Sequence, residues 1–289
     1  MREKLYLENL CDIHVVKDIL KKYGFNFSKS LGQNFIINPT VCPRMAQSCS
    51  DSGGSGVLEV GPGIGVLTSE LAKRFKKVVS VEIDKKLIPI LKETVGEYPN
   101  IKIINQDILK LDLEKLLQDE FSDCKQVNIC ANLPYYITSE IIMYLLESNP
   151  GFSSLTVMVQ KEAAERICAL PGTRNSGAIS LAVRYYGYPQ VLFNVGRGSF
   201  VPTPNVDSSV IKINMSNTNA QKVNNKKMFF KVVRAAFSQR RKNILNSIGA
   251  GLKISKENLK SVLEKINIDS TKRAEQLKME DFINISNNL

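Results

Sequence analysis

A glycine-rich turn, Gly61–Gly65 (GPGIG), is the first place in the sequence where residue types and spacing suggest chemistry. It directly follows the β-forming run Val57–Val60 and leads into a helix-like segment. Glycines let the backbone bend sharply and let a ligand approach without meeting a Cβ atom. Many nucleotide-binding proteins have such a turn, so by itself it indicates only a nucleotide or nucleoside ligand.

Two acidic residues narrow the choice of ligand. Glu82 lies near the end of the second β-rich run, about 20 residues past the glycines, where a carboxylate can accept hydrogen bonds from ribose hydroxyls. Asp107 ends the third run, where a carboxylate can accept from the amino group of an adenine. The GxGxxG spacing of dinucleotide sites is absent and no Walker lysine follows, so NAD and ATP fit poorly. We predict S-adenosylmethionine, which has no phosphate; the alternative is a structural turn with two surface acids.

The fourth run ends in Asn132, Leu133, Pro134 and Tyr135, which suit the methylation of an adenine amine. The exocyclic nitrogen is a poor nucleophile because its lone pair is delocalised into the ring. It needs acceptors that hold its two hydrogens and draw the nitrogen towards tetrahedral geometry. The side-chain oxygen of Asn132 and the backbone carbonyl before Pro134 can do this, since proline stiffens the turn and has no N–H. Tyr135 offers a flat face for an extruded base.

A second aromatic residue, Phe200, precedes the Pro-rich segment 201–204. We expect Phe200 to close the other side of the base, and the alternative is a core residue at a strand end. We expect Tyr136 to be a packing residue.

Short runs rich in Val and Ile alternate with helix-like segments from residue 57 onward. The runs are 57–60, 78–83, 101–107, 127–133 and 155–160, with helical segments such as 67–75 and 86–95 between them. This alternation predicts a doubly wound α/β domain with a parallel sheet covered on both faces. Ligands of such a domain bind at the carboxyl ends of the strands, where the residues above are found.

The pattern changes after residue 190. Two closing strands, within 191–200 and 208–215, are followed by a polar, Asn-rich segment at 214–227 and then by a wholly helical stretch. We therefore predict a cofactor-binding catalytic domain at 1–215 and a small helical, basic, RNA-binding domain at 216–289. The catalytic domain would begin with an amphipathic helix whose apolar residues are Leu5, Leu10, Ile13, Val16 and Leu20.

The net charge of +11 is concentrated in one part of the chain. No acidic residue occurs between Asp207 and Glu257, and the rest of the chain carries equal numbers of basic and acidic residues. Such a segment indicates a surface that faces a polyanion, the alternative being a merely solvated basic helix.

Three consecutive basic residues, Arg240, Arg241 and Lys242, lie within a predicted amphipathic helix at 228–248. A continuous helix would place Arg240 among apolar residues, which is costly for an unpaired charge. Either the helix breaks near Ser238 or Arg240 points into a crevice between the domains. In both cases we predict that the three residues bind RNA phosphates.

Several classes of function are excluded by composition. The six cysteines form no CxxC pair, so neither a zinc site nor a disulfide framework is expected, and reduced thiols suit a cytoplasmic protein. With His14 as the only histidine, a Ser-His-Asp hydrolase or a histidine metal cluster cannot be built. No apolar run reaches the roughly 20 residues that span a membrane, and the charged N-terminus is no signal peptide. Without a heptad pattern we expect a monomer.

Several motifs occur together in the order typical of one family. They are GQNF (32–35), EVGPGIG (59–65), VEID (81–84), QD (106–107), NLPY (132–135), MVQKE (158–162), FVPTPNVDS (200–208) and FSQRRK (237–242). On these residues, and over nearly its whole length, the chain resembles the KsgA-type ribosomal RNA adenine dimethyltransferases.

The resemblance implies a Rossmann-like class I S-adenosylmethionine-dependent methyltransferase with a small all-helical C-terminal domain. The implied reaction is dimethylation of N6 of two adjacent adenosines in the 3′-terminal hairpin of 16S ribosomal RNA, within a precursor of the 30S subunit. Lys29 and the rest of FSKSLGQNF would form a mobile flap, with Asn34 at the methionine end. The implied cofactor-binding residues are Asn34, Ile36, Gly61, Glu82, Asp107 and Asn132.

Two alternatives remain open at this point. An Erm-type antibiotic-resistance methyltransferase of 23S ribosomal RNA would share the cofactor site, although the GQNF, NLPYYI and FSQRRK segments favour the small-subunit enzyme. A non-catalytic RNA-binding assembly factor would need only the basic surface, but the acids and Asn132 are intact. A DNA adenine methyltransferase fits less well, since no separate base-reading domain is present.

Overall fold

The computed structural model of the chain describes residues 9–28, 31–49 and 53–289, so Leu5 and Lys29 lie outside the described residues. Contacts divide the chain into two compact units. The first contains the residues up to Ala164 together with Gln190–Asn214, and the second contains Glu165–Pro189 and Met215–Leu289. The second segment of the second unit begins at Met215, next to the boundary predicted between residues 215 and 216. Residues 165–189, predicted in the catalytic domain, instead pack with the C-terminal helices.

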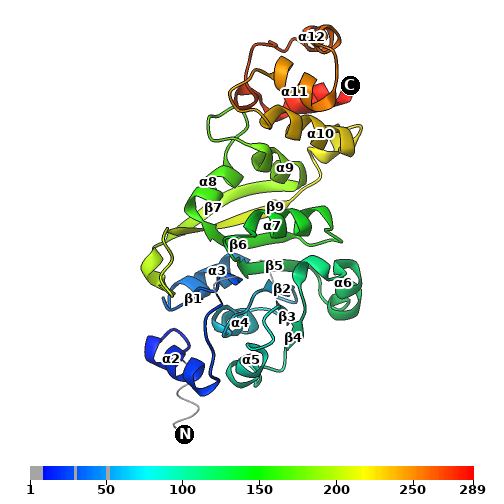
Figure 1. The fold of residues 1–289 in the computed structure, drawn as a ribbon. Helices are drawn as coiled ribbons and strands as arrows, with labels where there is room; N and C mark the ends of the chain where they lie inside the picture. Colours follow the sequence, from blue (N-terminus) through cyan, green and yellow to red (C-terminus); the bar gives the residue numbers. More distant parts are fainter. Residues whose placement is uncertain (1–8, 29–30, 50–52) are drawn as a thin grey trace. The chain divides into compact units, whose positions relative to one another are not determined.

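Seven strands form one sheet in the order β4-β3-β2-β5-β6-β9-β7 (Figure 1). Strands β4 to β6 in this order are parallel, and β9 is antiparallel to β6. The strands are β2 (Gly56–Val60), β3 (Lys77–Glu82), β4 (Ile101–Asn105), β5 (Val127–Asn132), β6 (Ser154–Gln160), β7 (Gly187–Val195) and β9 (Ser208–Met215). The Val- and Ile-rich runs predicted between residues 57 and 160 are therefore strands, with ends that agree to within two residues.

The order of strands reverses between β2 and β5. From β2 the chain adds β3 and β4 on one side and then returns to place β5 and β6 on the other side. In open parallel sheets ligands bind at such a switch point, beyond the carboxyl ends of the strands. Here β2 ends immediately before Gly61 and β5 ends at Asn132, so the fold brings these two motifs together.

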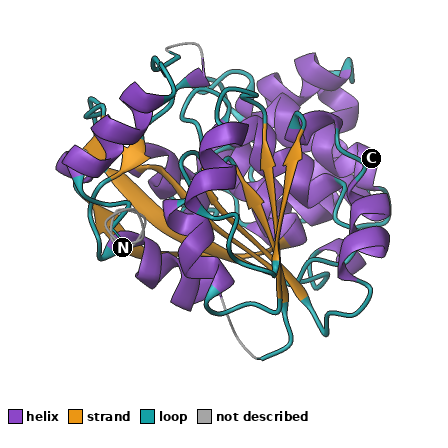
Figure 2. Cartoon of the chain, turned by 90° about the horizontal axis from the view of Figure 1, so that it is seen from below, coloured by secondary structure: helices purple, strands orange, loops and turns teal. Residues whose placement is uncertain are grey.

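The central strands are buried on both faces, which explains why their sequences do not alternate between apolar and polar residues. All of β2 is buried, as is β5 up to Ala131. Helices α3 (Val41–Cys49) and α4 (Val66–Ala72) pack against each other, α3 also against β5 and β6, and α4 against β3. Figure 2 shows the strands side by side with helices next to them.

The remaining elements of the first unit frame this sheet. They are α2 (Ile13–Lys22), α5 (Ile88–Thr94), η2 (Ile108–Lys110), α6 (Leu113–Phe121), α7 (Thr138–Glu147), η3 (Arg197–Ser199) and a two-stranded sheet of β1 (Phe35–Ile36) and β8 (Phe200–Val201), while α8 (Lys161–Cys168) crosses into the second unit. Of the apolar residues predicted for an N-terminal helix, Val16 and Leu20 are buried in α2 and Ile13 at its start is half-buried, whereas Leu10 is buried but precedes the helix.

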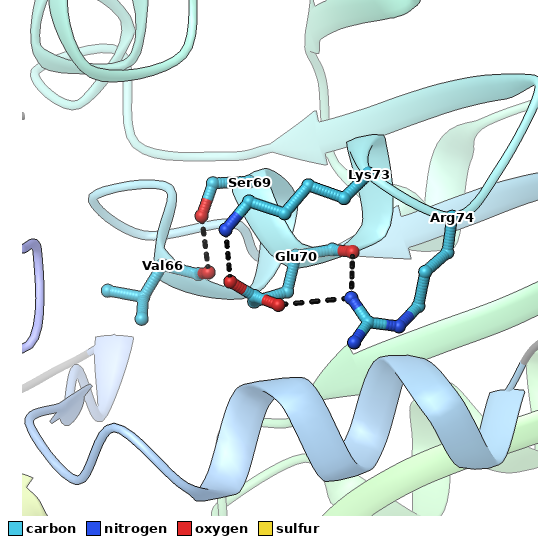
Figure 3. A network of polar contacts seen from close by, with 5 residues as sticks. All are labelled: Val66, Ser69, Glu70, Lys73 and Arg74. Carbon is cyan, nitrogen blue, oxygen red and sulfur yellow. Dashed lines mark hydrogen bonds and ion pairs between the residues drawn. The ribbon is translucent and has the colours of Figure 1, made fainter. Parts of the chain in front are cut away.

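Helix α4 begins directly after the glycine-rich turn and is held at its far end by charged side chains. Glu70 accepts from Lys73 Nζ at 2.5 Å and from Arg74 Nη1 at 3.0 Å, and Arg74 also donates to the Glu70 carbonyl at 3.1 Å (Figure 3). Ser69 Oγ donates to the Val66 carbonyl at 2.9 Å. Pairs three and four residues apart stabilise a short helix by a few tenths of a kcal/mol each, about 0.2–0.5 kcal/mol.

The second unit is helical. Its elements are α9 (Ala178–Tyr186), η4 (Ala220–Lys222), α10 (Lys226–Phe237), α11 (Ile244–Leu252), α12 (Lys256–Lys265), η5 (Ala274–Gln276) and α13 (Met279–Asn287). Leu181 and Tyr185 of α9 share one core with Phe229 of α10 and Phe282 of α13. The polar, Asn-rich segment 214–227 also contacts this unit, since Asn219 Nδ2 donates to the Arg184 carbonyl at 2.8 Å.

Residues 228–248 do not form one continuous helix. Helix α10 ends at Phe237, and Ser238 Oγ donates to the Ala235 carbonyl at 2.7 Å. Helix α11 starts after Asn243, whose side chain accepts from the backbone N–H of Asn246 at 3.0 Å. The chain thus follows the first of the two alternatives, a break near Ser238. The residues between these two caps, Arg240 to Lys242 included, are exposed in the turn.

Within the described part of the chain, none of the helices combines the length and the apolar character needed to cross a bilayer. The same residues contain no group of three or more His, Cys, Asp or Glu side chains arranged to hold a metal ion. All six cysteines are free thiols.

Candidate active site

A cavity opens at the carboxyl ends of the central strands and encloses about 1050 Å³, including the space at its mouth. It brings together nine of the residues predicted from the sequence. They are Asn34, Ile36, Gly61, Glu82, Asp107, Asn132, Leu133, Pro134 and Tyr135. Because β2, β3 and β5 are adjacent in the sheet, residues about 70 positions apart in the chain meet at one edge.

The floor of the cavity is the glycine-rich turn. Gly63 has a φ of +61°, and a Cβ atom there would lie 3.2 Å from the Phe35 ring. Gly65 has a φ of +93°, and a Cβ atom there would lie 2.8 Å from Val95. Both positions therefore require glycine, since a side chain would meet strain and steric overlap together. The resulting turn points the N–H of Gly63 at the Glu82 carboxylate, at 3.3 Å.

Glu82 is a buried carboxyl group in the wall of this cavity. Its Oε1 accepts from the backbone N–H of Asp84 at 2.8 Å and its Oε2 accepts from Gly63. Burial raises the pKa of Glu82 to about 7, although the two backbone N–H donors oppose this rise. The group therefore changes charge near neutral pH. In its ionised form it can accept hydrogen bonds from hydroxyl groups.

Asp107 lies at the end of the neighbouring strand. One of its carboxylate oxygens accepts from the backbone N–H of Leu109 at 3.0 Å, which caps η2 and holds the side chain at the cavity edge. Ile108 and Ile83 add apolar surface, and Ile83 is 54% exposed although it lines the cavity. Ile83 was not predicted, because it follows the last residue of β3 and looks like part of an apolar strand.

The lining residues, all of them described, include no Lys, Arg or His. Among these described residues a ligand with phosphates meets no cation, whereas a ligand with hydroxyl and amino groups meets the carboxylates of Glu82 and Asp107. A sulfonium and an ammonium group also suit a site whose charged groups are acids. The residues therefore fit S-adenosylmethionine better than a dinucleotide.

The Asn132 side chain is oriented by a backbone group. Its Nδ2 donates to the carbonyl of Asn34 at 3.2 Å, which leaves Oδ1 as an acceptor. The Leu133 N–H donates to the Met158 carbonyl at 3.1 Å, and the Pro134 carbonyl accepts from Thr138 Oγ1 at 2.9 Å. These bonds fix the turn after β5. Two acceptors, Asn132 Oδ1 and the Leu133 carbonyl, thus stand side by side along the chain at the cavity.

Two tyrosines follow, with different surroundings. The Tyr135 hydroxyl lies 2.6 Å from Ser208 Oγ, and the half-buried ring lines the cavity. Burial raises the pKa of Tyr135, and the hydrogen bond with Ser208 opposes this. Tyr136 also lines the cavity but is 57% exposed, so the expectation of a packing residue does not hold.

Phe200 differs from the prediction. It is 1% exposed, belongs to the hydrophobic core of the first unit and is not among the residues that line the cavity. In β8 it pairs with Ile36 of β1, and both residues belong to the same hydrophobic core. Phe200 therefore has no exposed face against which a base could stack, and the alternative of a core residue at a strand end is the observed one.

The predicted RNA-binding residues belong to the other unit. Arg240, Arg241 and Lys242 are all exposed in the turn between α10 and α11. The part of the chain that the structure describes shows no ion pair that involves them.

Comparison with known proteins agrees with these observations. The family description "Ribosomal RNA adenine dimethylase" matches residues 24–289. A protein of Alkaliphilus oremlandii named ribosomal RNA small subunit methyltransferase A is 47% identical over 274 residues, which cover 94% of this chain and 95% of that one. Its namesake in Clostridioides difficile is 43% identical over 281 residues, 97% of each chain.

Solved structures show the same fold. A dimethyladenosine transferase from Plasmodium falciparum superimposes with a TM-score of 0.72 at 26% identity, over 87% of this chain and 95% of that one. The 23S rRNA methyltransferase ErmE superimposes with a TM-score of 0.66 at 23% identity, over 88% and 99%, and so supports the fold alone. The predicted Rossmann-like methyltransferase fold with C-terminal helices is confirmed. From its motifs, its cavity and these matches, the chain belongs to the ribosomal RNA adenine dimethylase family.

Proposed function

We propose that this protein uses S-adenosylmethionine to dimethylate N6 of two adjacent adenosines in the 3′-terminal hairpin of 16S ribosomal RNA, during assembly of the small subunit. The observation that carries the proposal is that the turn Asn132–Tyr135 opens into the same cavity as Glu82 and Asp107. One cavity thus offers acceptors for a target amine beside acceptors for a nucleoside cofactor.

Each polar group of the cavity has a role in this proposal. Glu82 would accept hydrogen bonds from the ribose hydroxyls of the cofactor, and Asp107 from its adenine amino group. Gly61 lets the backbone approach the ligand, while Ile36 contributes apolar wall. Asn34 would hold the methionine end. When bound, the cofactor supplies a methyl group on a positively charged sulfur.

The residues after β5 act on the target base. Asn132 Oδ1 and the Leu133 carbonyl would accept the two hydrogens of the amine and so direct its lone pair towards the methyl group. No strong base is needed, because the amine nitrogen loses its proton readily once it carries the new methyl group. Tyr135, whose hydroxyl is held by Ser208, would stack on the base, and Pro134 keeps the turn rigid. Arg240, Arg241 and Lys242 would contact RNA phosphates.

The alternatives are weaker. An Erm-type enzyme shares the fold, but the curated relatives at 43% and 47% identity are both named small-subunit methyltransferases. A non-catalytic assembly factor would not need a cavity that Glu82, Asp107 and Asn132 all line. We further infer that the protein acts as a monomer in the cytoplasm, where its ribosomal substrate is assembled.

The proposal is tested with labelled S-adenosylmethionine and purified, unmethylated 30S and 50S subunits. We expect dimethyladenosine in the 30S sample alone, at two adjacent positions near the 3′ end of 16S RNA. The Asn132→Ala variant should still bind RNA and transfer no methyl group at a measurable rate. Label in the 50S sample would support the Erm-type alternative, and full activity of Asn132→Ala would remove the amine-holding role from that residue.

A further inference from the structure

Residues Leu31–Ile36, here named the strap, form one side of the cavity, and all six of them line it. Hydrogen bonds connect the strap to the ends of β5 and β3, which lie on either side of β2 in the sheet. At the end of β5, Asn132 Nδ2 donates to the Asn34 carbonyl at 3.2 Å. Beyond the end of β3, Gln33 Nε2 donates to Asp84 Oδ2 at 2.9 Å. The second tie joins residues 51 positions apart and involves no residue assigned a role above.

Both ends of the Gln33 amide are engaged. While Nε2 donates to Asp84, Oε1 accepts from the backbone N–H of Ser28 at 2.9 Å. These two bonds fix which way the amide points. Asp84 is fixed as well, since its Oδ1 accepts from the backbone N–H of Lys86 at 3.0 Å. An amide with two directed partners is a specific clamp rather than a solvated polar side chain.

The clamp is continuous with the cofactor site. The backbone N–H of Asp84 donates to Glu82 Oε1 at 2.8 Å, so Gln33, Asp84 and Glu82 form one chain of hydrogen bonds. The next residue of the strap, Asn34, supplies the carbonyl that orients Asn132. A strap that came loose at Gln33 would therefore disturb both the wall around Glu82 and the acceptor that faces the target amine.

We propose that Gln33 is a positioning residue, which fastens the strap over the cofactor through Asp84 and thereby keeps the Asn132 amide in the orientation that accepts the target amine. This inference rests on the proposed function for the identity of the cofactor. The physical gain is preorganisation. A strap already held in place need not be ordered when the cofactor binds, so less binding free energy is spent on lost chain entropy.

An exchange of the two partners tests the proposal. In Gln33→Glu two carboxylates face each other. In Asp84→Asn the introduced amide keeps its oxygen towards the Lys86 N–H and so turns its NH₂ towards the NH₂ of Gln33. Either change breaks the clamp. The double variant Gln33→Glu with Asp84→Asn restores one donor and one acceptor in reversed order. In it the introduced glutamate can still accept from the Ser28 N–H, and the introduced asparagine can still accept from the Lys86 N–H.

The first readout is cofactor binding without RNA. We expect each single variant to bind S-adenosylmethionine about tenfold more weakly by calorimetry, the loss expected for one charge-assisted hydrogen bond, and the double variant to recover most of it. The second readout is amide hydrogen exchange of residues 31–36 in the cofactor-free protein. Exchange should be faster in both single variants and return towards the wild-type rate in the double variant.

The third readout is turnover. The single variants should lower kcat as well as raise KM for the cofactor, while KM for RNA stays the same. Wild-type affinity and exchange in the single variants would overturn the proposal, as would a double variant no better than either single one. A lower melting temperature with unchanged affinity would assign Gln33 a purely structural role. If the wild-type protein bound S-adenosylmethionine but methylated another RNA, only the proposed substrate would fail.

Discussion

Glu82 combines two properties that normally oppose each other, burial and a requirement for negative charge. Its pKa is raised to about 7 because water is excluded from the carboxyl group. In the cofactor-free protein the folded state therefore keeps a proton that the unfolded state releases near pH 4.5. The stability that Glu82 contributes is present below that pH and is lost as the pH rises through about 7. Ribose hydroxyls would stabilise the ionised form, and cofactor binding then has to displace the proton.

We predict that affinity for S-adenosylmethionine falls as the pH is lowered from 8 to 6. Below pH 7 the dissociation constant should rise, at most about tenfold per pH unit, because one proton must leave Glu82 for each cofactor bound. Calorimetry in buffers of different ionisation enthalpy measures both the affinity and the released proton. Glu82→Gln should bind weakly with an affinity nearly independent of pH. Proton release that persists in Glu82→Gln would assign the effect to another group.

Substitutions of Phe200 can distinguish a role in core packing from a role in base stacking. Since it is 1% exposed, Phe200→Ala should destabilise the protein by about 3–5 kcal/mol, and Phe200→Leu by much less. We predict that Phe200→Leu keeps kcat within a few-fold of wild type, because the core is filled again and no stacking partner is lost.

The matched comparison is Tyr135→Leu, which removes an aromatic ring that lines the cavity. Tyr135→Leu should lower kcat strongly with a small change in melting temperature. Steady-state kinetics on 30S subunits and thermal unfolding measure both quantities. A stable Phe200→Leu protein with a large loss of kcat would show that Phe200 turns out of the core to reach the base.

The sequence predicted which residues line the cavity where chemistry restricts the residue type, and was less informative where only packing decides. Glu82, Asp107 and Asn132 could be found because they follow strand-forming runs, and polar residues at that place are readily explained by a ligand. Gln33 could not be found in the same way, since its partner lies 51 residues away. Phe200, expected at the base, is buried in the core, and Tyr136, expected to pack, is exposed at the cavity. The burial of an aromatic ring depends on neighbours that no local pattern specifies.

At the level of elements, strands were easier to predict than the interruption of a helix. Runs of Val and Ile identify strands buried on both faces, whereas the residues 228–248 have helical periodicity on both sides of the turn at Arg240–Lys242. The caps that end α10 and start α11, Ser238 and Asn243, are single polar residues in a basic segment. The prediction of a catalytic domain at 1–215 included α9, which packs in the second unit, for a related reason. Its apolar face, with Leu181 and Tyr185, could pack equally well on a sheet or on helices.

The close approach of α10 and α11 makes a prediction about Gly251. Alanine normally favours a helix over glycine by about 1 kcal/mol. Here a Cβ atom on Gly251 would lie 2.5 Å from Ala235 Cβ and 3.0 Å from its Cα, so the two helices would have to move apart. We therefore predict that Gly251→Ala destabilises the protein by about 1–3 kcal/mol, measured by urea unfolding.

The control is the compensating variant. Adding Ala235→Gly to Gly251→Ala exchanges the two residues across the contact and should recover part of the lost stability, because the closest overlap, with the Ala235 Cβ, is removed while the approach to its Cα remains. A single variant Gly251→Ala as stable as wild type would show that the helices have room for a methyl group and that helix propensity decides the outcome.

For the whole molecule, we expect the distribution of charge to determine which surface binds RNA. The net charge of +11 resides in the acid-free segment between Asp207 and Glu257, and the remainder of the chain is balanced. A chain of this kind is attracted to polyanions by one region while the rest adds little non-specific affinity. Within that region Arg240, Arg241 and Lys242 are consecutive and exposed, so up to three phosphates could be contacted by one turn.

The salt dependence of RNA binding tests this turn directly. Log affinity falls linearly with log salt concentration, and each phosphate contact that is lost makes this slope less steep by about 1. Replacing all three residues by Ala should therefore make the slope less steep by about 2–3. Binding should be weakened most at low salt. The control variant removes the same charge from exposed lysines elsewhere, with Lys115, Lys125 and Lys265 changed to Ala. Filter binding of a 16S 3′-hairpin RNA from 50 to 300 mM salt, roughly the range in which phosphate contacts dominate, measures both slopes. Because net charge is equal in the two variants, a slope reduced only in the first assigns the contacts to the turn between α10 and α11. Equal reductions would instead mean that RNA responds to the total charge and that the turn has no special role.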